Sequence, residues 1–111
     1  MLNKYVIERT IPGLGDSSES EFAKMAEKSN AVLSEMGTDI KWHESYATDD
    51  KMYCIYSAKN EEVIRDQAER GGFPVDRISE VKRVLTPETA DTSSILSKPT
   101  DTDSDRMDYL S

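Results

Sequence analysis

The residues best suited to chemistry in this chain are its single histidine, His43, and its single cysteine, Cys54. Imidazole nitrogen and thiolate sulfur are ligands that borderline metal ions such as Ni²⁺ and Zn²⁺ prefer in proteins. A bound ion would need further ligands, and a carboxylate from Glu8 or Glu80 could supply one of them. The sequence therefore predicts a metal site if the fold places these side chains together.

Strand periodicity predicts a hairpin that does this. Residues 39–47 and 52–58 each read as a strand, and four turn residues separate them. His43 would lie opposite Tyr56, which makes His43 and Cys54 diagonal neighbours on one face, about 7 to 8 Å apart at the backbone. Both residues are also compatible with a structural role, Cys54 as a small buried side chain and His43 as a polar residue of an edge strand.

The two faces of this hairpin are expected to differ. The face predicted to pack under the helices consists of Trp42, Glu44, Tyr46, Tyr53 and Ile55. The other face would be open, with Met52, Cys54 and Tyr56 in a row along one strand. Monomeric proteins seldom expose such an apolar row. We therefore expect a homodimer in which a second copy of the chain covers the open sheet face.

The rest of the chain supplies the elements that would hold the hairpin. The predicted elements are a strand over 2–11, a helix over 22–36, a second helix over 61–70 and a last strand over 77–85. Ser18 and Glu21 fit a capping box in front of the first helix, and Asn60 caps the second. The resulting β-α-β-β-α-β order predicts an α+β, ferredoxin-like fold. It has a four-stranded antiparallel sheet with two helices on one face, as in dimeric α+β barrels.

Composition limits the remaining possibilities. With 111 residues, one domain is expected, over 1–85, followed by an acidic and largely disordered tail over 86–111. The net charge of −8 leaves no basic stripe for nucleic acid or for an anionic membrane surface. One cysteine cannot form an intrachain disulfide. Because no apolar run is long enough for a signal peptide or a membrane span, we expect a cytoplasmic protein.

A resemblance supports this fold. Residues 3–85 resemble a family of small bacterial domains of unknown function that includes a nickel-binding protein of ferredoxin-like fold. The segments that carry the resemblance are 5–9 with Pro12-Gly13, Trp42 with Ser45-Tyr46, 48–54, Gly72-Phe73-Pro74 and 78–81. The resemblance implies a dimer and the binding of nickel or another transition metal. Members commonly have a histidine in the second helix where this chain has Gln67, a poor ligand for such metals.

The leading hypothesis is a small, dimeric ligand-binding protein without catalysis of its own. Its ligand would be nickel, zinc or another divalent transition metal, held by His43, Cys54 and Glu8. One alternative is a cofactor-free enzyme of the dimeric α+β barrel type, an oxygenase or isomerase, with His43 or Tyr56 as acid or base. It would require an enclosed cavity of roughly a few hundred Å³ between sheet and helices. A second alternative is a protein-interaction module that uses the acidic tail.

Overall fold

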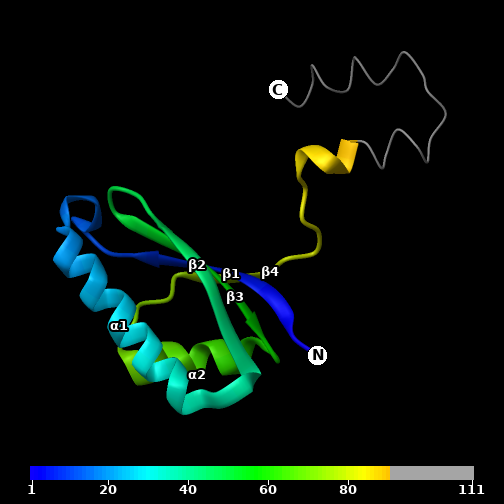
Figure 1. Cartoon of the computed structure of the whole chain (residues 1–111), viewed down its shortest axis with the longest axis horizontal. Coiled ribbons are helices and arrows are strands. Elements are labelled where there is room, and N and C mark those ends of the chain that lie inside the picture. The colour runs from blue at the N-terminus through cyan, green and yellow to red at the C-terminus, as the bar shows by residue number, and fades with distance from the viewer. Residues whose placement is uncertain (91–111) are drawn as a thin grey trace. The chain divides into compact units, whose positions relative to one another are not determined.

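The predicted ferredoxin-like fold is confirmed by the computed structural model, which describes residues 1–90. Its elements are β1 (Asn3–Thr10), α1 (Glu19–Met36), β2 (Ile40–Ala47), β3 (Lys51–Ala58), α2 (Glu61–Gly71) and β4 (Arg77–Glu80). The strands form one antiparallel sheet in the order β2-β3-β1-β4. The first and third strands are therefore central, as expected, and β2 is an edge strand (Figure 1).

The predicted helix starts are confirmed atom by atom. The Ser18 hydroxyl accepts the Glu21 backbone N–H at 3.1 Å, and the Glu21 carboxylate accepts the Ser18 N–H at 2.7 Å. Asn60 Oδ1 likewise accepts the Val63 N–H at 3.0 Å. Each bond satisfies a donor that the first turn of a helix leaves without a partner. The α2 helix ends at Gly71 and is capped by Gly72, whose φ of 68° is in the left-handed region that glycine tolerates.

The last strand is shorter than predicted. We expected strand structure over 77–85, but β4 ends at Glu80. Glu80 pairs with Tyr5, and β1 begins at Asn3, so few residues of β1 remain to pair with a longer β4. The Val81 N–H donates to the Lys4 carbonyl at 2.8 Å and ends the ladder. Strand propensity alone cannot extend an edge strand beyond its partner.

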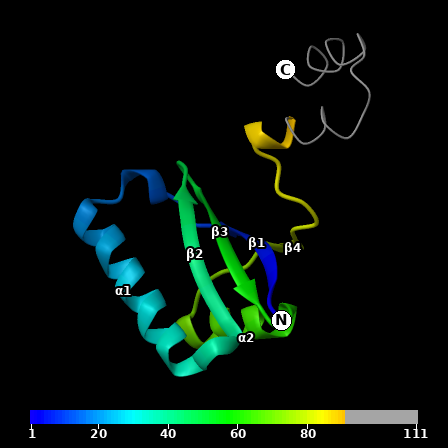
Figure 2. The ribbon, with the colours of Figure 1, turned by 45° about the vertical axis from the view of Figure 1, so that its right-hand side comes forward.

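Both helices pack on the same face of the sheet, where the core lies (Figure 2). The buried core residues are Tyr5, Ile7, Ile40, Cys54, Tyr56, Ala58 and Ile64. Leu33 and Met36 near the end of α1 pack against them. Burying each large aliphatic side chain contributes about 1.5–3 kcal/mol, so this cluster dominates the stability of the domain.

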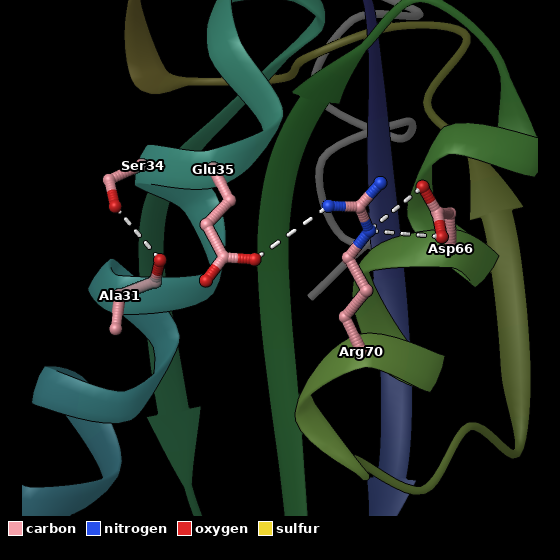
Figure 3. A network of polar contacts seen from close by, with 5 residues as sticks. All are labelled: Ala31, Ser34, Glu35, Asp66 and Arg70. Atoms are coloured by element: carbon pink, nitrogen blue, oxygen red, sulfur yellow. Dashed lines mark hydrogen bonds and ion pairs between the residues drawn. The ribbon is translucent and has the colours of Figure 1, made fainter.

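An ion pair on the surface joins the two helices near the C-terminal end of α1. Arg70 of α2 lies 3.8 Å from a carboxylate oxygen of Glu35 on α1, and its Nε lies 3.2 Å from both oxygens of Asp66 (Figure 3). The three side chains are exposed to solvent. Exposed pairs of this kind contribute little, roughly 0–1 kcal/mol. Packing, rather than charge, therefore holds this end of α1.

The compact unit comprises Met1–Val81, and Lys82–Ser111 form a second unit. Most of the predicted acidic tail lies outside the described residues. Its described part contains one helical turn over 87–90, in which Thr89 Oγ1 accepts the Thr86 N–H at 3.0 Å. No helix within residues 1–90 combines the length and the apolar character that crossing a bilayer requires.

Candidate functional site

A β-bulge at His43 changes the predicted geometry of the hairpin. Trp42 pairs with Tyr56, and Glu44 pairs with Ile55, so His43 is an extra residue in β2. The expected pairing of His43 with Tyr56 is therefore wrong. The pairs between the bulge and the turn, from Glu44–Ile55 to Ala47–Met52, are as predicted.

The predicted assignment of the two faces is also wrong, apart from Trp42 and His43. Cys54 and Tyr56 are only 3% and 2% exposed because the helices cover their face. Tyr53 and Ile55, expected in the core, lie on the open face and are half-buried. The strand β3 is apolar on both faces, so its own sequence could not distinguish them. The exposed row from which a dimer was inferred does not exist.

The residues predicted to bind a metal do not come together. His43 is exposed on the open face, where its Nε2 lies 2.7 Å from Ser57 Oγ. Cys54 faces the interior, on the opposite side of the sheet. Glu8 is on the open face but two strands away from His43, roughly 15 Å at the backbone from strand spacings. Glu80 pairs with Tyr5 on the far edge strand. Within residues 1–90, no group of three or more His, Cys, Asp or Glu side chains is placed to hold a metal ion.

The structure contains instead a cavity of about 520 Å³ between the N-terminal half of α1 and the sheet. Its main walls consist of Phe22, Met25, Ala26 and Ser29 from α1, Trp42, Ser45 and Ala47 from β2, and Met52, Cys54 and Tyr56 from β3. Several of these side chains are small, so helix and sheet do not fill the space between them. The volume lies within the range of about 300–1,000 Å³ that is typical of small-molecule sites.

A chain of buried polar side chains borders this cavity. Arg9 of β1 is 3% exposed and donates from one guanidinium nitrogen to the Pro74 carbonyl at 2.8 Å. Its other terminal nitrogen contacts Gln67 Oε1 at 3.5 Å. The Gln67 amide nitrogen donates to the Tyr56 hydroxyl at 3.2 Å, and that hydroxyl lies 3.4 Å from Ser29 Oγ. Because arginine cannot accept a hydrogen bond, the oxygen of the Gln67 amide must face it.

The Tyr56 hydroxyl is kept in its neutral form. Burial raises the pKa of Tyr56 above its ordinary value of 10.0, and the hydrogen bond with Ser29 and the charge of Arg9 oppose this only partly. The phenol therefore retains its proton at physiological pH and can donate it in a hydrogen bond. It is suited to bind an acceptor or to act as an acid, but not to act as a base.

Phe73 completes one wall of the cavity. Its ring packs against Gly71, where an added Cβ would come within 2.2 Å of a ring carbon. The ring centroid lies 5.4 Å from the Arg9 guanidinium and 5.4 Å from the Lys28 ammonium nitrogen. Cation–π attraction to both groups helps to fix the ring. The Gly-Gly-Phe-Pro segment thus does more than end α2, because it also shapes the cavity.

The sequence-based hypothesis missed Arg9 and Ser29 and interpreted Gln67 only as a lost metal ligand. The signals were present: Arg9 continues the inward alternation of Tyr5 and Ile7, and Gln67 follows Ile64 by three residues on the buried side of α2. Gln67 is 0% exposed, beneath the sheet and away from His43. A polar residue in phase with a core stripe indicates an internal hydrogen-bond network.

Comparisons with known proteins identify relatives. Residues 5–81 match the family described as "Nickel responsive protein SCO4226-like". Among solved structures, the chain is similar to the crystal structure of SCO4226 from Streptomyces coelicolor A3(2). The TM-score is 0.62 at 16% sequence identity, over 74% of this chain and 99% of that one. No protein with curated annotation matches the chain. At this identity, the structural likeness supports the fold and not the function.

Proposed function

The chain belongs to the nickel-responsive SCO4226-like family, and within it we propose a small-ligand-binding protein without catalysis of its own, whose ligand occupies the cavity beneath α1. One observation carries this proposal: the cavity of about 520 Å³ combines apolar walls with a few convergent polar groups. That combination is the usual signature of a small-molecule site, because apolar walls supply affinity and polar groups supply orientation.

The only tryptophan of the chain makes the proposal directly testable. Trp42 lines the cavity, so a bound molecule that absorbs near the tryptophan emission will quench its fluorescence. We expect the neutral apolar dye N-phenyl-1-naphthylamine to bind and to quench Trp42. The variant Ala26→Phe, which places a ring in the cavity, should lose this binding. Ala31→Phe, on the exposed side of the same helix, should retain it. Equal binding by the two variants, or none by the native protein, would count against the cavity as a ligand site.

A transition metal ion is the second candidate ligand, and family membership favours it. His43 is the predicted ligand best placed for it, because it is exposed beside Glu44 on the bulge. Glu8 shares that face of the sheet, whereas Cys54 faces the cavity side. Since His43 and Glu44 offer at most two ligands, and the Tyr46 hydroxyl already donates to Glu44, we propose that a nickel ion would need donors from a second subunit.

A homodimer through the open sheet face therefore remains part of the metal proposal, on different residues from those first expected. Tyr46 on this face is 52% exposed, and Val6, Tyr53 and Ile55 are half-buried. Calorimetric titration with Ni²⁺ tests the metal, and sedimentation velocity tests the dimer. We expect His43→Ala to abolish the heat of Ni²⁺ binding and Cys54→Ala to preserve it. No heat with the native protein would rule out nickel at this face.

The enzyme alternative receives less support. A pocket of the required volume is present and Tyr56 lines it, but the pocket is partly open to solvent and His43 lies on the other side of the sheet. Of the two candidate acid or base residues, only Tyr56 therefore reaches the cavity. The interaction-module alternative concerns the acidic tail, most of which lies outside the described residues.

A further inference from the structure

The charge of the cavity wall is opposite to that of the chain. The whole sequence has 22 acidic and 14 basic residues, yet the cavity lining contains Arg9 and Lys28 and no aspartate or glutamate. Both cations flank the Phe73 ring, with Lys28 exposed and Arg9 buried. In a protein of net charge −8, this is a local site of positive potential.

The Arg9 guanidinium has no charge partner among residues 1–90. Its hydrogen bonds go to the Pro74 carbonyl and the Gln67 side-chain oxygen, which are both neutral. A guanidinium keeps its charge under all ordinary conditions, and a buried charge without a counter-charge is unfavourable. An anion bound in the cavity would remove that penalty. Arginine also presents its donors in a planar fork that matches a carboxylate.

The Tyr56 hydroxyl adds a second donor. It accepts a hydrogen bond from the Gln67 amide, so its own hydrogen is free for another acceptor. Its present neighbour, Ser29 Oγ, lies at 3.4 Å, near the limit for a hydrogen bond, and either hydroxyl can be the donor there. A ligand oxygen could therefore replace Ser29 at little cost. Gln67 links Arg9 and Tyr56, which keeps both donors on one side of the cavity.

The remaining walls determine the rest of the ligand. Phe22, Met25, Trp42, Met52 and Phe73 present aromatic and thioether surfaces that favour an apolar body. From this geometry we infer that the cavity binds an apolar monocarboxylic acid, with its carboxylate directed to Arg9 and Tyr56 and its hydrocarbon part against these walls. The inference rests on the proposed ligand-binding function and specifies the chemical class of its ligand.

A matched pair of compounds separates the inference from the function on which it rests. Calorimetric titration of the full chain with 1-naphthylacetate and with 1-naphthylacetamide compares an acid with a neutral molecule of nearly the same shape. We expect the acid to bind about tenfold tighter or more, because charge-assisted hydrogen bonds are stronger than neutral ones. Equal affinities would overturn the inference and leave the proposed function standing. Failure of both compounds to bind would count against both.

Two variants locate the effect. In Arg9→Met, naphthylacetate should lose about tenfold in affinity, to the level of the amide, while the amide changes little. Tight binding of the acid by this variant would overturn the inference.

Lys28→Met changes an exposed residue, so it tests the charge at the rim of the cavity without disturbing the core. We expect a loss of about threefold for the acid and none for the amide, since exposed charges interact weakly. Lys24→Met, outside the cavity lining, is the control; an equal loss there would show that only net charge matters.

Discussion

The two halves of α1 lie over the same sheet but meet it differently. Near its C-terminal end, Leu33 and Met36 pack against the core cluster that includes Ile40 and Ile64. Near its N-terminal end, helix and sheet leave the cavity between them. Both halves carry the same kind of apolar stripe. The difference lies in the sheet, which presents Ser45, Ala47 and Cys54 under the first half. In this domain, side-chain size on the opposing sheet surface, and not helix amphipathicity, therefore decides where the space beneath α1 is hollow.

The largest expected effect comes from truncating one large residue in the filled region beneath α1 and one at the cavity wall. Ile64→Ala in the filled half should lower the free energy of unfolding by about 2–5 kcal/mol, because the rigid surroundings cannot close the new void. Met25→Ala at the cavity wall should cost less than about 1 kcal/mol, since its side chain already borders empty space. Urea unfolding followed by circular dichroism measures both. Similar losses would show that the two halves are packed alike.

The reverse test enlarges one small buried residue away from the cavity and one at the cavity wall. Ala68 of α2 is 4% exposed and outside the cavity lining, so it has little room for more atoms and Ala68→Leu should cost about 1–3 kcal/mol. Ala26→Leu places its extra carbons in the cavity and should be neutral or stabilising by about 0.5–2 kcal/mol. Thermal unfolding of both variants provides the measurement. A destabilised Ala26→Leu would mean that the cavity is smaller in solution than described.

Tyr56 belongs to the core cluster and also lines the cavity, and the ionisation of its hydroxyl provides a pH test. Burial raises the pKa of Tyr56 in the folded state, while in the unfolded chain the phenol ionises near 10.0. Its contribution to stability is therefore complete below pH 10.0 and is lost as the pH rises through the folded-state pKa. The slope is at most about 1.4 kcal/mol per pH unit for one proton. Urea unfolding between pH 9 and 11 should show a shallower decline for Tyr56→Phe than for the native chain.

The smallest effect is expected from the ion pair that joins the helices. Arg70→Ala removes contacts with Glu35 and Asp66, but all three groups are exposed. We expect a loss below about 1 kcal/mol, which 1 M NaCl should reduce further. Lys24→Ala, elsewhere on α1, serves as the control for removing one positive charge. A larger loss would mean that the filled half depends on this pair as well as on its apolar contacts.

The sequence predicted the order of elements, both caps and the central positions of β1 and β3, because periodicity and capping are local properties. It failed at His43, since one extra residue in β2 reversed the expected faces of the hairpin. The local signal is weak: His43, Glu44 and Ser45 are all polar, so the sequence does not show which of them is the extra residue. The candidate site followed the same error. The network of Arg9, Gln67 and Tyr56 depends on three separate elements, and only the fold determines their proximity.

The bulge also changes the exposed edge of the sheet. β2 is an edge strand, and regular edge strands are templates for pairing with other chains and for aggregation. An extra residue at His43 interrupts the regular spacing of backbone donors and acceptors, and Lys41 and Glu44 are exposed around it. The opposite edge, β4, has only four residues. Both edges of the sheet therefore resist strand addition, so neither edge favours assembly of the chain into a fibre.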